Sequence, residues 1–161
     1  MRGLRWICVP LSVAVLGVML AATAGATTTK VPVSGTEVTT AVTDPGTFWV
    51  SGNVAHMRGF GTRSSITGSP EIAGTNSLTI NWNVNTVTGA GSLWGTFDDD
   101  VATSTGGFAG SWNGTFTDTG WSGSAVGEGY GALAGWQERL DLESVLGVVY
   151  ADGYVFSPAD K

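Results

Sequence analysis

The sequence is poor in cysteine, histidine and positive charge. It contains one cysteine, Cys8, and one histidine, His56, in 161 residues, and its seven lysines and arginines are outnumbered by 13 aspartates and glutamates. Because Cys8 lies in the N-terminal apolar run, the rest of the chain has no thiol for a disulfide or a redox centre. A net charge of −6 also argues against nucleic acid and anionic membrane surfaces as partners, since both require a cationic footprint.

Helical periodicity is missing as well. No stretch of ten or more residues after the N-terminal run combines helical spacing with helix caps, and apolar residues instead alternate with glycine, serine, threonine and asparagine. No Gly-x-Ser-x-Gly elbow, phosphate-binding loop or metal-ligand spacing stands out. The sequence therefore predicts an all-β domain and gives no catalytic residue, metal site or cofactor.

The first 26 residues resemble an export signal. Arg2 and Arg5 precede an apolar run from Ile7 to about Ala22, and small residues follow at 24–26. This run is shorter than the roughly 20 residues that span a bilayer, so we expect cleavage near Ala26 rather than stable membrane insertion. Cleavage would leave 135 residues, change the net charge from −6 to −8, and place the protein in the periplasm or outside the cell.

A repeated cassette indicates the architecture. Gly91–Phe97 reads GSLWGTF, and Gly110–Phe116, 19 positions later, reads GSWNGTF. Short segments bounded by glycine and carrying threonine and aromatic residues are typical of consecutive strands in a meander. Both copies are therefore expected to be neighbouring strands of one sheet.

Other segments alternate in the same way. The strands expected outside the cassettes are Val31–Val42, Phe48–Phe60, Ser77–Asn83, Trp121–Glu128, Gly135–Leu142 and Val148–Phe156, the last interrupted at Asp152–Gly153. Asp44–Gly46 is expected to be a turn, and Arg63–Ala73 a loop or bulged strand. We divide the chain into a signal peptide (1–26), an N-terminal extension or edge strand (27–46) and a β-barrel domain (47–161).

About eight short strands fit a sandwich or an up-and-down barrel. We favour a single antiparallel barrel, because closure removes the open edges through which so aromatic a sheet would aggregate. Glycines inside the strands supply the bends that closure needs.

Three segments carry a resemblance to a known group. Val50–Gly59, Gly110–Phe116 and Gly127–Gly131 resemble secreted bacterial proteins of unknown function that are similar to the allene oxide cyclase and dirigent type of β-barrel. The resemblance covers most of residues 47–157. It implies an eight-stranded barrel with a lumen and no established activity. Plant allene oxide cyclases, which this group is similar to, work without a cofactor.

The candidate ligand-binding residues are His56, Arg58, Trp94 and Glu128. His56 and Arg58 are two positions apart, so they share a strand face and could hold an anionic or carbonyl ligand if that face lines the lumen. The alternative is a solvent-facing pair. Glu128 lies between glycines. Trp94 is one of the six tryptophans that follow the predicted signal peptide, and these could stack on a ligand or fill the core.

Two further features of the sequence are acidic. Glu138, between Trp136 and Leu140, could be a buried carboxylate with a raised pKa, or it could be exposed or paired with an arginine. Asp98–Asp100 could bind Ca²⁺, but it lacks EF-hand spacing and reads better as a solvated hairpin loop.

Three functions remain open. The first is a secreted barrel that binds a small apolar or sugar-like ligand, or a surface partner, without catalysis. The second is a cofactor-independent isomerase or cyclase that uses His56, Arg58 and Glu128 in a lumen. The third is an avidin-like or carbohydrate-binding module. Oligomeric state and ligand identity do not follow from the sequence.

Overall fold

The structure, a computed structural model, describes residues 28–158, and almost all of them lie in strands. The predicted signal peptide lies outside the described residues. The elements are β1 (Thr29–Asp44), β2 (Thr47–Ser51), β3 (Val54–Gly68), β4 (Gly74–Asn85), β5 (Gly91–Val101), β6 (Gly107–Phe116), β7 (Gly120–Tyr130), the 3₁₀ turn η1 (Gly131–Leu133), β8 (Gln137–Val145) and β9 (Val148–Ser157). None of the helical segments in this part of the chain is long and apolar enough to cross a membrane.

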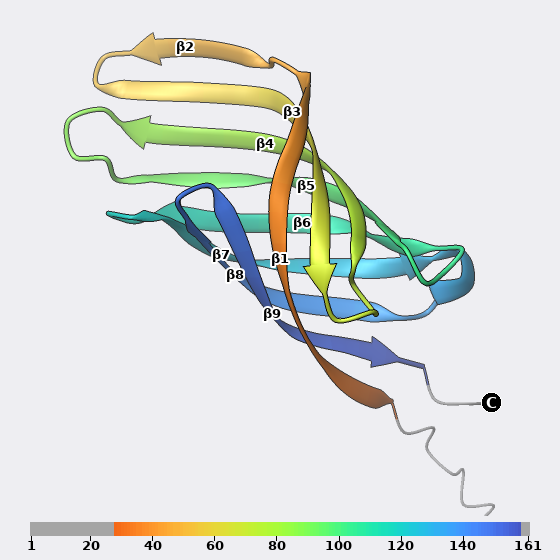
Figure 1. Cartoon of the computed structure of the whole chain (residues 1–161). Coiled ribbons are helices and arrows are strands. Elements are labelled where there is room, and N and C mark those ends of the chain that lie inside the picture. Colours follow the sequence, from red (N-terminus) through yellow and green to blue (C-terminus); the bar gives the residue numbers. More distant parts are fainter. Residues whose placement is uncertain (1–27, 159–161) are drawn as a thin grey trace, which may run out of the picture.

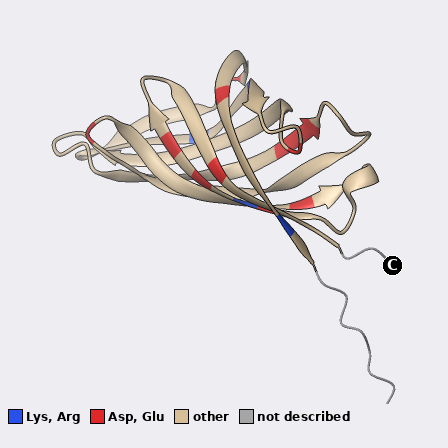
Figure 2. Cartoon of the chain, turned by 60° about the horizontal axis from the view of Figure 1, so that its bottom comes forward, with Lys and Arg blue, Asp and Glu red and all other residues tan. Residues whose placement is uncertain are grey.

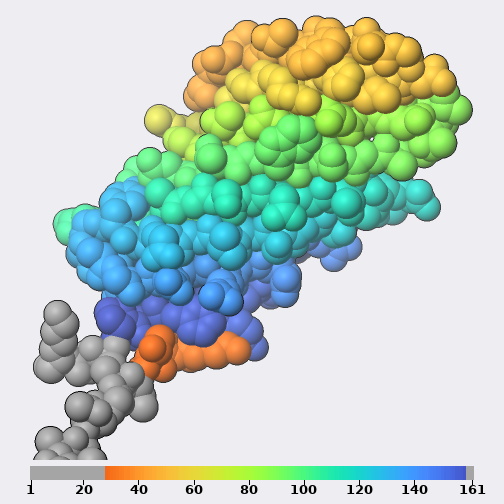
Figure 3. All heavy atoms as spheres, turned by 180° about the vertical axis from the view of Figure 1, so that it is seen from behind, coloured from red at the N-terminus to blue at the C-terminus, as the bar shows by residue number. Residues whose placement is uncertain are grey.

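The strands form a closed antiparallel barrel of eight strands with β2 as a ninth, additional strand. From β2 to β9 each strand pairs with the next in the chain, so the wall is a meander (Figure 1). Seen from behind, the strands follow one another in chain order, and the start of β1 lies beyond β9 (Figure 3). The expected all-β antiparallel barrel is confirmed.

β1 closes the barrel by pairing with two strands in succession. Thr29–Val38 pairs with β9, and Gly35–Asp44 pairs with β3. The segment that we interpreted as an N-terminal extension or edge strand thus contributes a strand to the barrel wall. Pro32 lies before the pairing with β3 begins, so its missing N–H interrupts no ladder on that side.

The segment Phe48–Phe60 forms a hairpin rather than the single strand expected. β2 ends at Ser51, Ser51 pairs with Val54, and Gly52 adopts a left-handed φ of 59° at the first turn position. Glycine at that position is typical of a type II′ hairpin turn, whose twist suits antiparallel strands. The period-two pattern did not reveal this reversal, because alternation continues across a two-residue turn.

The turn at Asp44–Gly46 is confirmed. It joins β1 to β2, and both strands then pair with β3. Gly46 has a φ of 64°, and its N–H donates to Asp44 Oδ1 at 2.8 Å.

The two cassettes lie in β5 and β6, which pair antiparallel from Ser92–Thr115 to Asp100–Gly107. Their equivalent residues Leu93 and Trp112 are both buried, at 4% exposure each, and both face the barrel interior. The prediction of consecutive meander strands is confirmed.

The last strand is not interrupted at Asp152–Gly153, contrary to the prediction. Asp152 and Gly153 lie within a continuous β9 and pair in register with Asp141 and Leu140. The hairpin before β9 is formed instead by Leu146 and Gly147, both at positive φ.

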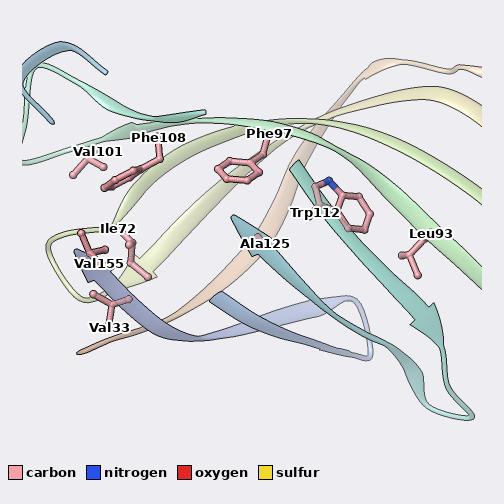
Figure 4. Close-up of a cluster of buried hydrophobic side chains, with 9 residues drawn as sticks. All are labelled: Val33, Ile72, Leu93, Phe97, Val101, Phe108, Trp112, Ala125 and Val155. Atoms are coloured by element: carbon pink, nitrogen blue, oxygen red, sulfur yellow. The ribbon is translucent and has the colours of Figure 1, made fainter. Parts of the chain in front are cut away.

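One end of the barrel is packed shut by apolar side chains. Val33, Ile72, Val101, Phe108 and Val155 gather there, and Phe108 and Val155 have no exposed surface (Figure 4). Burying one such side chain contributes about 1.5–3 kcal/mol. Phe97, Trp112, Ala125 and Leu93 continue the cluster along the interior, so this plug forms the floor of the site described next.

Candidate functional site

The barrel interior contains a cavity of about 260 Å³. All eight barrel strands contribute to its lining, which is mostly apolar. Its larger apolar members are Leu78, Ile80, Leu93, Phe97, Trp112, Trp121, Leu140 and Leu142. The rings of Trp112 and Trp121 lie 5.4 Å apart, so together they form an aromatic wall.

The cavity reaches the seam between β1 and β9. The β1–β9 ladder ends at Val38–Val148, and the lining includes Thr39, one residue beyond it, and Gly147 in the β8–β9 turn. The opposite end is closed by the apolar plug. This geometry places the mouth of the cavity beside the β8–β9 turn.

Three carboxyl groups from different strands line this apolar cavity. They belong to Glu37 of β1, Asp99 of β5 and Glu138 of β8. Glu138 is 1% exposed and Asp99 5% exposed, whereas Glu37 is half-buried. Asn76, which pairs with Asp99 on the adjacent strand, donates from Nδ2 to Glu37 Oε1 at 3.1 Å.

Asp98–Asp100 is therefore not the solvated hairpin loop that we expected. All three residues lie inside β5, where alternation exposes Asp98 and Asp100 and turns Asp99 into the cavity. The run of three carboxylates looked like a loop because burying a single carboxylate is costly. Figure 2 shows acidic residues on several strands of the wall rather than only in its turns.

Burial in the cavity disfavours the charged form of each carboxyl group. Burial, together with the nearby carboxylates of Glu138 and Glu37, raises the pKa of Asp99 to about 9. Burial alone raises the pKa of Glu138 to about 7, and burial also raises the pKa of Glu37. Near neutral pH Glu138 is therefore poised between its neutral and charged forms, whereas Asp99 is mostly protonated.

The glycines of β7 make room for Glu138. A Cβ added at Gly127 would lie 2.9 Å from Glu138 Oε1 and 2.8 Å from Phe97 Cζ. The missing side chain at Gly127 therefore permits the close approach of both groups. Any larger residue at 127 would displace either the carboxyl group or the ring.

Several buried polar atoms of the lining lack a hydrogen-bond partner among the described residues. They are Thr62 Oγ1, Asn76 Oδ1, Asp99 Oδ1, Trp112 Nε1 and both Oε atoms of Glu138. Buried polar groups without partners are rare in folded proteins and are costly. None of the four cations in residues 28–158 lines the cavity, so none of them supplies the missing partner there.

His56, Arg58 and Trp94 are brought together on the outside of the wall. Arg58 lies 5.4 Å from the ring of Trp49 and 4.8 Å from that of Trp94. Arg58 Nη2 donates to Asn83 Oδ1 at 2.8 Å, and His56 Nδ1 donates to the same oxygen at 2.7 Å, because an amide oxygen can only accept.

The side chains of this outer cluster, His56, Arg58 and Trp94, already have partners within the barrel wall. The His56 ring stacks on Trp49 at 4.8 Å, and Arg58 Nη1 donates to the carbonyls of Met57 and Trp82. None of its side chains lines the cavity. The solvent-facing alternative for His56 and Arg58 thus describes their position, and a binding role for them stays a prediction.

Glu128 lies apart from that cluster. It is exposed on β7 and accepts a hydrogen bond from Gln137 Nε2 at 3.0 Å. Glu138, the other carboxylate expected on a buried face, is the one that enters the cavity. The isomerase hypothesis required His56, Arg58 and Glu128 to meet in the lumen, and none of them lines it.

Neither a metal-site arrangement nor a known relative identifies a function for the cavity. No group of three or more His, Cys, Asp or Glu side chains within residues 28–158 is arranged to hold a metal ion. Comparison of the chain with protein-family models, curated proteins and solved structures finds no match. The resemblance to the allene oxide cyclase and dirigent barrels therefore stays a prediction.

Proposed function

We propose that this protein binds a small, mostly apolar organic molecule inside the barrel. The observation that carries the proposal is the cavity of about 260 Å³, closed by a plug at one end and lined by aromatic and aliphatic side chains with a few polar groups. Small-molecule sites are typically concave and mostly apolar, with volumes of roughly 300–1,000 Å³. A ligand of about one aromatic ring with a short side chain suits this size.

The chemistry of the lining supports binding rather than catalysis. The lining contains no histidine, cysteine or lysine, so neither a Ser–His nor a Cys–His nucleophile–base pair is present among its residues. Carbohydrate binding is less well supported, since the outward-facing Trp49 and Trp94 already contact Arg58.

Binding of 2-phenylethanol, a neutral probe of suitable size, tests this proposal. Trp112 and Trp121 line the cavity, so their fluorescence should change in a saturable manner during titration. Ala125→Leu, which adds volume inside the cavity, should weaken binding at least about tenfold, since overfilled packing cannot admit a ligand. Val126→Leu, on the exposed side of the same strand, is the matched control.

Equal binding by both variants, or a lack of saturable binding by the unsubstituted protein, would contradict the proposal. Circular dichroism of each variant establishes that the barrel is intact.

We also propose that the protein is exported and processed near Ala26. The supporting pattern is the pair of arginines, the apolar run and the small residues of the first 26 positions. Mass spectrometry of the protein recovered from the periplasm or medium should find a chain that begins at Thr27. An N-terminus at Met1 in that fraction would contradict processing.

A further inference from the structure

The unpartnered atoms of the cavity are mostly hydrogen-bond acceptors. Both oxygens of Glu138, one of Asp99 and the amide oxygen of Asn76 are buried, line the cavity and have no partner among the described residues. Burial favours the neutral form of these carboxyl groups, but once ionised they can only accept hydrogen bonds, so a cation with several N–H donors complements their charged form.

We infer that the ligand of this cavity is an organic amine, whose ammonium group lies among Glu138, Asp99 and Glu37 while its apolar body packs against Phe97, Trp112 and Trp121. This inference rests on the proposed function and names the ligand class. An ammonium carries three N–H donors and a positive charge, and a buried carboxylate needs both.

Two observations besides the acidic cluster point to such a ligand. First, Asn76 presents a buried amide oxygen to the same cavity, and Asn76 is only 5% exposed. Second, the remaining lining is aromatic and aliphatic, which suits the hydrocarbon part of an amine.

A metal ion is a poorer candidate for the same position. The three carboxyl groups come from β1, β5 and β8, and no described group of side chains has the arrangement of a metal site. Hard cations such as Ca²⁺ and Mg²⁺ also prefer six or more oxygen ligands, including water, whereas these walls are largely apolar.

The experiment compares three probes of one size: 2-phenylethylamine, 2-phenylethanol and phenylacetate. Calorimetric titration at pH 8 should give the tightest binding for the amine, roughly 10- to 100-fold over the alcohol, because hydrogen bonds to charged groups are stronger. Glu138→Gln should abolish most of that preference and leave the affinity for the alcohol within about twofold. Glu143→Gln, on the exposed face of the same strand, should leave the preference intact.

Each outcome decides between the two proposals. Equal affinity for the amine and the alcohol overturns the amine assignment, and so does binding of phenylacetate that is tighter than binding of the amine. Neither result contradicts ligand binding in the cavity. An amine preference that survives both Glu138→Gln and Asp99→Asn overturns the assignment to these carboxylates. Failure of all three probes to bind the intact protein overturns the proposed function as well.

Discussion

Replacing Glu138 by glutamine should stabilise the protein at alkaline pH and leave it almost unchanged at acidic pH. Burial raises the pKa of Glu138 from 4.5 to about 7 in the folded protein. Between these values the folded state holds a proton that the unfolded state has released. The unfolded state thus binds fewer protons, and the free energy of unfolding falls as pH rises through this interval.

The size of the effect follows from the shift in pKa. One pKa unit corresponds to about 1.4 kcal/mol, so Glu138 lowers the free energy of unfolding by about 2–3 kcal/mol between pH 5 and pH 8. Asp99, whose pKa is raised to about 9 by burial first and by the Glu138 charge second, adds a loss of the same sign; the substitution removes only the part that comes from the Glu138 charge. Both proteins should lose stability as pH rises, and the unsubstituted protein should lose more.

Urea unfolding followed by tryptophan fluorescence measures the difference. With a urea dependence of about 1–3 kcal/mol per molar, the unfolding midpoint of Glu138→Gln should exceed that of the unsubstituted protein by roughly 1–3 M at pH 8. At pH 5 the difference in the free energy of unfolding should shrink to less than about 1 kcal/mol, because pH 5 lies only about half a unit above the unfolded-state pKa of 4.5. Glu143→Gln, on the exposed face of β8, should shift neither midpoint appreciably.

An equal difference between the two proteins at pH 5 and pH 8 would refute the reasoning. It would mean that Glu138 does not titrate in the folded protein within that interval. A lower midpoint for Glu138→Gln at pH 8 would also refute it, because the carboxylate would then have a stabilising partner that the structure lacks among its described residues.

Three further predictions concern other parts of the molecule. Gly46→Ala should lower the free energy of unfolding, measured in urea, by at least about 1 kcal/mol. Residue 46 has a φ of 64°, and the new Cβ would lie 2.6 Å from the Arg58 carbonyl oxygen. An unchanged urea midpoint would contradict that geometry. Arg58→Lys should lower the free energy of unfolding by about 1–2 kcal/mol, because a lysine cannot contact the rings of Trp49 and Trp94 and also donate to Asn83. A free energy of unfolding equal to that of the unsubstituted protein would show that the outer cluster does not stabilise the fold. Affinity for 2-phenylethylamine should rise from pH 5 to pH 8 as Glu138, whose pKa is about 7, ionises, whereas affinity for 2-phenylethanol should stay constant. Parallel pH profiles in calorimetry would contradict this prediction.

The sequence predicted the barrel because its period-two alternation and turn residues are local signals. The GSLWGTF and GSWNGTF cassettes became adjacent strands, and glycine with a left-handed φ stands at the predicted turn after Asp44. Closure by β1 was not predicted. It depends on long-range pairing of Gly35–Asp44 with β3 and of Thr29–Val38 with β9, which no local pattern reports.

The site was predicted only in part, since strand alternation tells which residues share a face but not which face is inside. Glu138 was recognised because apolar residues flank it at alternate positions. His56 and Arg58 share a face as expected, yet Met57 and Trp82 occupy the inner face and the pair lies outside. Asp99 was missed because its neighbours Asp98 and Asp100 made the segment look solvated. The alternation of Leu93, Phe97 and Asp99 could have indicated an inward carboxylate.

The same carboxyl groups that would hold an amine also lower the stability of the protein without its ligand. A partner at one hundred times its dissociation constant stabilises a protein by about 2.7 kcal/mol, which is similar to the loss assigned to Glu138 at pH 8. If Glu138 served only the fold, its replacement would change stability and leave ligand preference alone. If it binds an ammonium group, Glu138→Gln must raise the urea midpoint without ligand and reduce the preference for the amine over the alcohol. The substitution would then raise stability and lower the preference for the amine. Measuring both quantities on this one variant therefore separates a binding residue from a structural one.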